Sequence, residues 1–421
     1  MTTAQLVAGL DIGSAKTTAV IAEVVGDLPK HPTVNILGVG QARTTGLRRN
    51  VVADIDESTR SIKKAFEDAE RMAGAKVTTV YAGIAGEHVQ AMTSTGIASV
   101  TGAEITRADV DRANAVARAQ SIPQDRELIH AIPQEYAVDK NVGIRDPVGM
   151  IGTRLETEMY LVTIGSSPAM NLRKAVERAG YKIGELVLEP LASALAVLTD
   201  DEKELGVCLV EMGAGTTDVA VFHEGKIRYL GTVGLGGLNV TSDVVHGLGV
   251  TQADAERLKE EFGCVYEPSV DRTDVIQLPS TVAQGDRQIP RELLAHIMHQ
   301  RTSEIFEMIV REVQQAGYIK KLAAGVVVTG GAAAQPGTAE LASDVFGTGA
   351  RVGLPGEFLG GLADNVAQPR FSTVVGLVQY GAHRVALGGA TSKGRRFSTP
   401  GSGQSMDKIA QRVKTWLQDF F

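Results

Sequence analysis

The feature that most constrains the fold of this chain is a strand–turn–strand pattern that occurs twice. The stretch LVAGLDIGSAKTTAVIAEV occupies residues 6–24, and the stretch VCLVEMGAGTTDVAVFHEGKI occupies residues 207–227. In each, apolar and β-branched runs flank a turn of small residues, which predicts two tightly joined strands. Asp11 of the first stretch falls on Glu211 of the second. A repeat of this kind, about 200 residues apart, predicts two related domains that face each other.

Both halves of the chain also alternate strand patterns with helical patterns. Residues 56–74 and 167–180 are amphipathic and end at Gly, which predicts two helices. Residues 77–86 and 322–337 are apolar runs of the kind that form strands. Alternation of this type indicates an α/β fold, and 421 residues suffice for two or more domains.

Composition excludes some functional classes. A net charge of −7 and an isoelectric point of about 5.7 argue against a general nucleic-acid binder. The first residues, MTTAQLVAGLDIG, contain neither a basic region nor a long apolar segment, so we expect no secretory signal. The two cysteines, Cys208 and Cys264, do not form a CxxC pair for zinc.

The turns of the two repeats have the composition of phosphate-binding loops. Turns of Gly, Ser, Ala and Thr let backbone N–H groups approach an anion closely, and two turns from facing domains can clasp one triphosphate. Asp11 and Glu211 can hold Mg²⁺, mainly through its waters, and Lys16 can reach a phosphate. Neither turn is a Walker A loop, because GxxxxGK[ST] is absent and a strand follows. Either turn alone could be an ordinary β-turn, but their common register favours a shared anion site.

The C-terminal stretch SMDKIAQRVKTWLQDFF, residues 405–421, predicts an amphipathic helix. It is too short in apolar residues to span a bilayer, but it can lie on an anionic membrane surface. The Gly/Ser-rich residues 389–404 before it predict a flexible linker, which favours a membrane or partner surface over packing on the protein itself. The predicted membrane-contacting residues are Ile409, Val413, Trp416, Leu417, Phe420 and Phe421, with Lys408, Arg412 and Lys414 facing the head groups.

Five segments, in order and spacing, resemble the motifs of the actin, Hsp70 and sugar-kinase ATPase fold. Two are the repeated turns; the others are the connecting helices at 186–198 and 373–383 and the adenosine motif at 326–337. This resemblance implies that Glu189 orients the attacking water and that Glu256 and Lys259 contact the ribose. The implied nucleotide-binding residues are Gly13, Ser14, Ala15, Lys16, Thr17, Gly213, Ala214, Gly215, Thr216, Thr217, Gly237, Glu256, Lys259, Gly330 and Gly331.

Residues 129–163, IHAIPQEYAVDKNVGIRDPVGMIGTRLETEMYLVT, resemble the subdomain that is inserted in the FtsA family of bacterial cell-division proteins. The resemblance extends over essentially residues 5–421 and implies an actin-like α/β fold with four subdomains. The implied ranges are 1–86, 164–200 and 376–388 for subdomain 1A, 87–163 for the inserted 1C, 201–235 and 324–375 for 2A, and 236–323 for 2B.

The second turn departs from the family pattern DIGGGTTD, because Glu211 replaces Asp and Ala214 replaces Gly. The longer Glu side chain shifts the geometry for activating a nucleophile, and a misplacement of about 1 Å can cost about a hundredfold in rate. We therefore expect binding of ATP with Mg²⁺ but weak or absent hydrolysis, with Glu189, Asp11 and Glu211 as the candidate catalytic residues.

The resemblance implies a protein that polymerises on the inner leaflet of the cytoplasmic membrane at the division site. It also implies that subdomain 2B binds the C-terminal tail of FtsZ, that FtsZ filaments are thereby tethered, and that later division proteins are recruited. The alternatives are a PilM-like pilus-assembly protein and a small-molecule kinase of the same fold. An Hsp70-like chaperone is disfavoured, because no substrate-binding β domain follows the ATPase segments.

Overall fold

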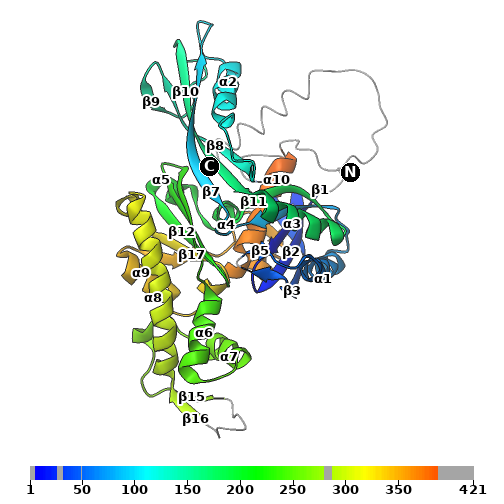
Figure 1. The fold of residues 1–421 in the computed structure, drawn as a ribbon, viewed down its shortest axis with the longest axis vertical. Coiled ribbons are helices and arrows are strands. Elements are labelled where there is room, and N and C mark those ends of the chain that lie inside the picture. Colours follow the sequence, from blue (N-terminus) through cyan, green and yellow to red (C-terminus); the bar gives the residue numbers. More distant parts are fainter. Residues whose placement is uncertain (1–4, 26–31, 49, 279–286, 387–421) are drawn as a thin grey trace.

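The computed structural model describes residues 5–25, 32–48, 50–278 and 287–386. The predicted linker at 389–404 and the predicted terminal helix at 405–421 lie outside these ranges. Two sheets form the centre of the molecule, and one smaller lobe projects from each end of its long axis (Figure 1). Across the described ranges, no helix has both the length and the apolar content needed to cross a membrane.

The first central sheet has six strands in the order β11-β6-β1-β2-β3-β19. Their bounds are β1 (Gln5–Ile12), β2 (Lys16–Val25), β3 (Thr33–Arg43), β6 (Thr79–Ile84), β11 (Lys182–Leu188) and β19 (Leu359–Gly361). Both faces of this sheet are buried, which explains why its strands read as continuous apolar runs. On β1, Leu10 packs with the core of one face and Val7 with the core of the other.

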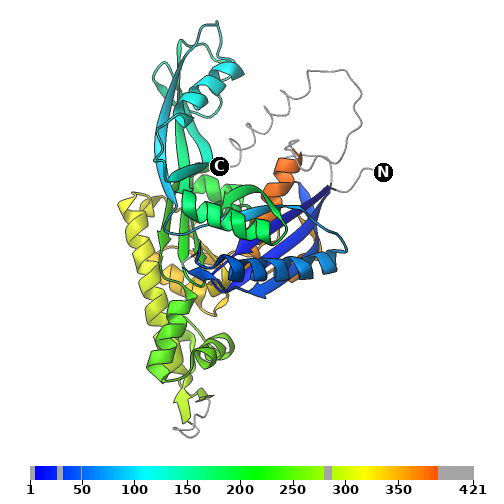
Figure 2. The same cartoon turned by 45° about the vertical axis from the view of Figure 1, so that its right-hand side comes forward.

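Helices α1 (Ile55–Ala73) and α3 (Ser166–Arg178) lie side by side over one face of this sheet (Figure 2). The N-cap of α1 is Asp54, whose side chain accepts a hydrogen bond from the backbone N–H of Glu57. The helix ends at Gly74 in the left-handed conformation, as Gly allows. The helices predicted at 56–74 and 167–180 are thus confirmed.

The second central sheet has five strands in the order β14-β13-β12-β17-β18. Their bounds are β12 (Val207–Met212), β13 (Thr217–His223), β14 (Lys226–Val233), β17 (Val326–Thr329) and β18 (Ala350–Val352). Strands β12 and β13 form the same antiparallel hairpin as β1 and β2, and β17 pairs parallel to β12 as β6 does to β1. The predicted repeat is therefore a repeat of structure. The strand expected within 322–337 is short, because a 3₁₀ turn begins at Gly331.

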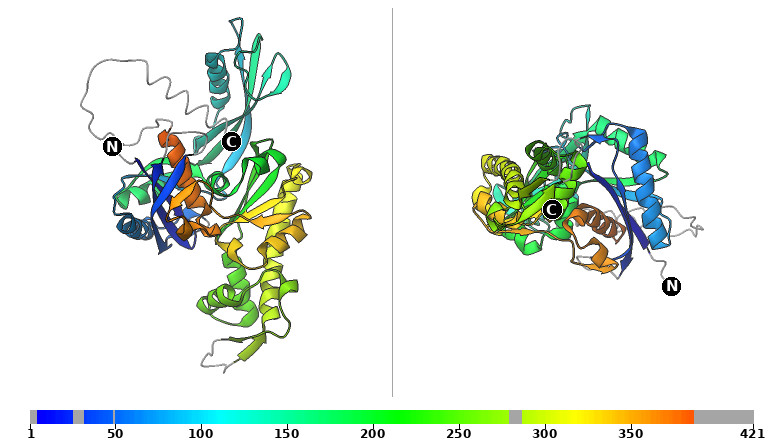
Figure 3. Two further views of the ribbon diagram at one scale, coloured as in Figure 1. Left: turned by 180° about the vertical axis from the view of Figure 1, so that it is seen from behind. Right: turned by 90° about the horizontal axis from the view of Figure 1, so that it is seen from below.

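Helices α4 (Glu189–Val197) and α10 (Ser372–Ala386) cross between the two sheets. Seen from behind, α10 in orange lies between the first sheet in blue and the second sheet in green (Figure 3). A Cβ on Gly376 of α10 would lie 1.7 Å from the carbonyl oxygen of Ala192 on α4, so the crossing requires glycine. One hydrophobic core includes residues of both sheets and both helices. The two halves are therefore joined through a shared core.

The upper lobe is built on the sheet β7-β10-β8-β9 with one helix against it. The bounds are β7 (Gln90–Ser99), β8 (Arg126–Val138), β9 (Asn141–Ile144), β10 (Arg154–Gly165) and α2 (Arg107–Arg118). A separate small core holds α2 to this sheet, including Val110 and Leu155. Residues Ile132 and Val162, farther along β8 and β10, belong to the central core, so the lobe is anchored through its longest strands.

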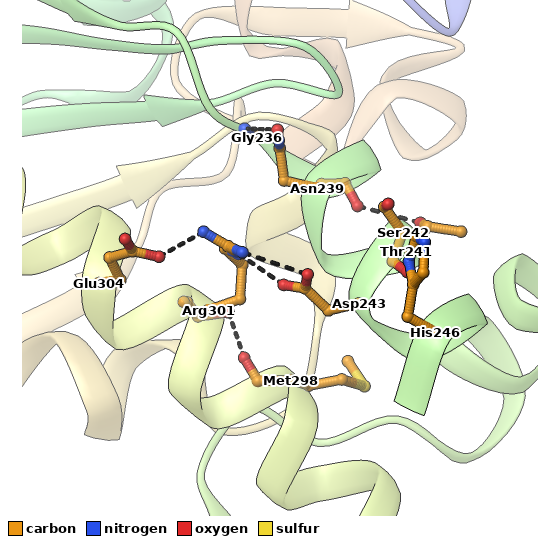
Figure 4. Close-up of polar contacts among 11 residues, drawn as sticks. Gly236, Asn239, Thr241, Ser242, Asp243, His246, Met298, Arg301 and Glu304 are labelled. Carbon is orange, nitrogen blue, oxygen red and sulfur yellow. Dashed lines mark hydrogen bonds and ion pairs between the residues drawn. The ribbon is translucent and has the colours of Figure 1, made fainter. Parts of the chain in front are cut away.

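The lower lobe consists mainly of helices. Its elements are α6 (Gly237–Leu248), α7 (Gln252–Phe262), β15 (Val275–Leu278), β16 (Arg287–Pro290) and the long α8 (Arg291–Gln315). Arg301 of α8 makes two hydrogen bonds to the carboxylate of Asp243 on α6, at 2.5 and 3.1 Å, and also contacts Glu304 (Figure 4). This bidentate pair fixes α8 against α6.

The remaining elements are short. They are β4 (Leu47–Arg48), β5 (Val51–Val52), α5 (Asp200–Leu205) and α9 (Thr338–Phe346). The loop that carries β4 and β5 reaches the cleft between the two central sheets through Asn50, which lies between these strands.

Candidate functional site

The two repeated turns face each other across a cleft of about 500 Å³. Each turn is closed by the same hydrogen bond: the N–H of Gly13 donates to the Lys16 carbonyl at 3.1 Å, and the N–H of Gly213 donates to the Thr216 carbonyl at 2.9 Å. The predicted residues that line the cleft are Asp11, Gly13, Ser14, Ala15, Lys16, Glu189, Glu211, Gly213, Ala214, Thr216, Gly237, Glu256, Lys259, Gly330 and Gly331.

Three predicted nucleotide ligands do not line the cleft. The Thr17 hydroxyl contacts the Thr44 hydroxyl at 2.8 Å, and the Thr217 hydroxyl donates to the Leu235 carbonyl at 2.9 Å. A Cβ on Gly215 would lie 2.6 Å from Oγ of Ser14, so the tips of the two turns are in contact. These three residues are placed to hold the turns in position.

Asn50 joins the two turns, and the sequence patterns did not single it out. Its side-chain oxygen accepts a hydrogen bond from Ser14 Oγ at 2.8 Å, and its amide nitrogen donates to Thr216 Oγ1 at 2.8 Å. The backbone φ of Asn50 is 58°, in the left-handed region that Asn tolerates better than most residues. The only sequence feature at this position is an asparagine in a turn-rich segment, and that feature is too common to indicate a residue of a binding site.

Four acidic side chains lie in the cleft near the two repeated turns. They are Asp11, Glu189, Glu211 and Asp218. Burial raises the pKa of Asp11 to about 7, of Glu211 to about 8 and of Asp218 to about 6. Burial, followed by the charge of Asp11, also raises the pKa of Glu189 well above its ordinary value. Such crowding of carboxyl groups favours a bound cation.

Asp218 is the second site residue that was missed. It pairs with Glu211 across the β12–β13 hairpin, where the first hairpin has Thr18 opposite Asp11. Its carboxylate accepts hydrogen bonds from Thr232 Oγ1 at 2.6 Å and Thr216 Oγ1 at 3.2 Å. Because the two hairpins differ at this position, matching the repeats could not identify it.

The residues fit a magnesium ion that keeps most of its waters. Within the described ranges, no three His, Cys, Asp or Glu side chains are arranged to ligate a metal directly. One carboxylate oxygen of Glu211, Oε2, is buried without a hydrogen-bond partner among the described residues. Mg²⁺ commonly retains several waters and binds one or two carboxylates together with phosphates, which matches this arrangement.

The other end of the cleft has the character of a nucleoside site. The Lys259 ammonium is buried, where it donates to Thr241 Oγ1 at 2.7 Å and to Glu256 Oε2 at 2.9 Å. Gly330 has a φ of 88°, and a Cβ there would lie 2.6 Å from the Met212 carbonyl oxygen. Gln335 and Arg370 also line this end and were not predicted.

Comparison with solved structures identifies the fold. The PilM–PilN type IV pilus biogenesis complex matches with a TM-score of 0.63 at 15% identity, over 89% of this chain and 98% of that chain. MreB5 of Spiroplasma citri bound to ADP matches with a TM-score of 0.52 at 14% identity, over 91% of this chain and 98% of that chain. The predicted actin-like α/β fold is confirmed.

Comparison of sequences distinguishes between the families that share this fold. The family "Cell division protein FtsA" matches residues 208–376, and the "SHS2 domain inserted in FTSA" matches residues 86–163. Cell division protein FtsA of Neisseria meningitidis is 38% identical over 98% of this chain and 98% of its own length. FtsA of Pseudomonas aeruginosa is 36% identical over 99% of this chain and 98% of its own length. PilM resembles this chain in fold alone, so these matches decide against the pilus-type alternative: the chain belongs to the FtsA family of cell-division proteins.

Proposed function

We propose that this protein binds ATP with Mg²⁺ in the cleft and uses the bound nucleotide to control its assembly on the cell membrane. The observation that carries the proposal is the meeting of two phosphate-type turns beside four carboxyl groups. The N–H groups of both turns and the Lys16 ammonium would bind the phosphates, and Asp11 and Glu211 would hold Mg²⁺ through its waters. Glu256 and Lys259 would contact the ribose, and Gly330 and Gly331 the base.

Hydrolysis is proposed to be weak or absent. A water-activating base must be ionised at the working pH, but burial raises the pKa of Glu189 well above its ordinary value. In addition, the Glu211 carboxylate accepts a hydrogen bond from Thr373, away from the phosphate turns. The nucleotide would then act as an assembly ligand that turns over slowly.

Membrane attachment is proposed for the stretch 405–421. One amphipathic helix of this length binds a bilayer weakly and reversibly. Polymerised subunits would present many helices at once, which turns weak anchors into strong avidity. Assembly controlled by ATP would thereby control residence on the inner leaflet.

The division-related partners follow from family membership. We propose that subdomain 2B, the lower lobe, binds the C-terminal tail of FtsZ and that subdomain 1C, the upper lobe, contributes to the contact between subunits. Filaments of FtsZ would be tethered to the membrane in this way, and later division proteins would be recruited to the same site.

The test is co-sedimentation with anionic liposomes of the full chain and of a chain ending at Gly403, with and without ATP and Mg²⁺. We expect only the full chain to pellet with lipid, and cooperatively so when ATP and protein concentration rise. Lipid binding by the full chain that is unaffected by ATP and by protein concentration would contradict the coupling between assembly and membrane residence.

A further inference from the structure

Glu211 makes a contact with helix α10 that the proposed role of holding Mg²⁺ does not require. It lies on β12 at the beginning of the second phosphate turn, yet its Oε1 accepts a hydrogen bond from Oγ1 of Thr373 on α10. Thr373 is in turn paired with Ser193 of α4. The Ser193 and Thr373 hydroxyl groups lie 3.1 Å apart, and both residues are buried. The Glu211 carboxyl group thus contacts α10 directly and is linked to α4 through the Thr373 hydroxyl, where the two helices cross.

This contact spans the boundary between the two halves of the molecule. Glu211 belongs to the second sheet, whereas α10 is packed on the first: a Cβ on Gly9 of β1 would lie 2.8 Å from the Val374 carbonyl oxygen. The neighbouring hydroxyl of Ser372 makes a parallel contact, at 2.6 Å, with Oγ1 of Thr329 on β17. The start of α10 is therefore bound to two adjacent strands of the second sheet.

Side-chain length decides whether this contact can form. An aspartate at position 211 would end one carbon–carbon bond earlier and would face the cleft without reaching Thr373. With glutamate, one oxygen is used by the hydroxyl, while Oε2 has no hydrogen-bond partner in the described part of the chain and remains available to a metal-bound water.

We propose that Glu211 is a positioning residue that ties the second phosphate turn to the crossing of α4 and α10, and that this tie must break when the cleft opens to exchange nucleotide. The tie itself is a feature of the fold; its effect on exchange rests on the proposed binding of ATP. The glutamate that replaces aspartate in this chain would accordingly slow exchange as well as alter metal geometry.

Four variants of the full chain separate the tie from the metal role. Thr373→Val and Glu211→Asp break the tie; Glu211→Asp retains a carboxylate for the metal. Glu211→Gln keeps an oxygen that can accept from Thr373 but removes the charge, and Thr373→Ser keeps the donor. The readout is the dissociation rate of a fluorescent ATP analogue, measured by stopped flow in Mg²⁺ and in EDTA.

We expect Thr373→Val and Glu211→Asp each to accelerate dissociation about tenfold in both buffers, the size of one lost hydrogen bond to a carboxylate. Combining them should add little, because both remove the same contact. Thr373→Ser should behave like the unmodified chain. Glu211→Gln should match it in EDTA and need more Mg²⁺ for half-maximal binding. Equal behaviour of the Asp and Gln variants, or no effect of Thr373→Val, would overturn the proposal.

A second readout does not depend on nucleotide. The unfolding midpoint of the nucleotide-free chain should fall for Thr373→Val and Glu211→Asp and should not fall for Thr373→Ser or Glu211→Gln. If the unmodified chain bound no ATP analogue, the proposed function would fail, and this midpoint series would still decide whether the tie exists.

Discussion

The side-chain amide of Asn50 donates to the hydroxyl of Thr216 at 2.8 Å and so connects a loop of the first half to the repeated turn of the second. The same Asn50 accepts from Ser14 in the first turn. A single side chain outside both motifs therefore bridges them.

We expect Asn50→Gly to lower the free energy of unfolding by about 1 kcal/mol, because it removes two hydrogen bonds and keeps a backbone that tolerates φ of 58°. Asn50→Ala should cost about 1 kcal/mol more, since alanine is strained in the left-handed region. Denaturant titrations of both variants provide the measurement. An alanine variant as stable as the glycine variant would show that the backbone conformation imposes no constraint.

We expect the acidic cluster to make the nucleotide-free chain lose stability as pH rises from about 4 to about 8. Burial raises the pKa of Asp11 to about 7 and of Glu211 to about 8, so the folded state holds protons there that the unfolded state has released. The free energy of unfolding then decreases as pH rises. The stabilisation that these carboxyl groups contribute is complete only below their ordinary pKa values. Burial lowers the pKa of His130 from 6.5 to about 4. This group therefore adds stability as pH rises from about 4 to 6.5, and it opposes the effect of the carboxyl groups in that range only.

Thermal unfolding of the nucleotide-free chain at several pH values measures this effect. The variant Glu211→Gln has no carboxyl proton to release and should show a shallower decline between about pH 4.5 and pH 8 than the unmodified chain. A midpoint that rises with pH across this range would contradict the assignment of protonated carboxyls.

We expect Lys259 to contribute to the discrimination between nucleotides that have different sugars. Lys259→Met should weaken ATP binding about tenfold by removing a charged hydrogen-bond donor. It should also reduce the preference for ATP over its 2′,3′-dideoxy analogue, which a fluorescence titration of both nucleotides detects. An unchanged preference would place the sugar elsewhere in the cleft.

The helix crossing predicts one severely destabilising substitution. Gly376→Ala would place a methyl group 1.7 Å from the Ala192 carbonyl oxygen, so α10 and α4 must separate, at a cost of about 3 kcal/mol. Gly349 has no atom near an added Cβ, and Gly349→Ala should stay within about 0.5 kcal/mol of the unmodified chain. Unfolding curves of the two variants form a matched pair, and similar midpoints would disprove the close crossing.

Much of the fold was predictable because the apolar patterns of the repeats are strong and local. The β1–β2 and β12–β13 hairpins, α1 and α3 follow directly from strand runs, small-residue turns and Gly at helix ends. The inserted lobe was predicted only from the resemblance to a family, because no simple periodicity in the sequence marks where such a lobe begins.

The site was less predictable, because several of its contacts join residues that are distant in sequence. Thr373 reaches Glu211 across 162 positions, and Asn50 reaches Thr216 across 166. No sequence pattern distinguishes a Thr or Asn that lines a binding site from one on the protein surface. The crossing of α4 and α10 brings Thr373 to Glu211, and the loop that carries β4 and β5 brings Asn50 to Thr216.

The shared core at that crossing also has a mechanical consequence. The upper and lower lobes project from opposite ends of the long axis, with the crossing between them (Figure 1). A small rotation of one half about the crossing would move the lobe ends much farther than it moves residues at the crossing, because displacement grows with distance from the axis. If a ligand in the cleft rotates the two halves, a neighbouring molecule that contacts only the lobe ends would respond to that ligand.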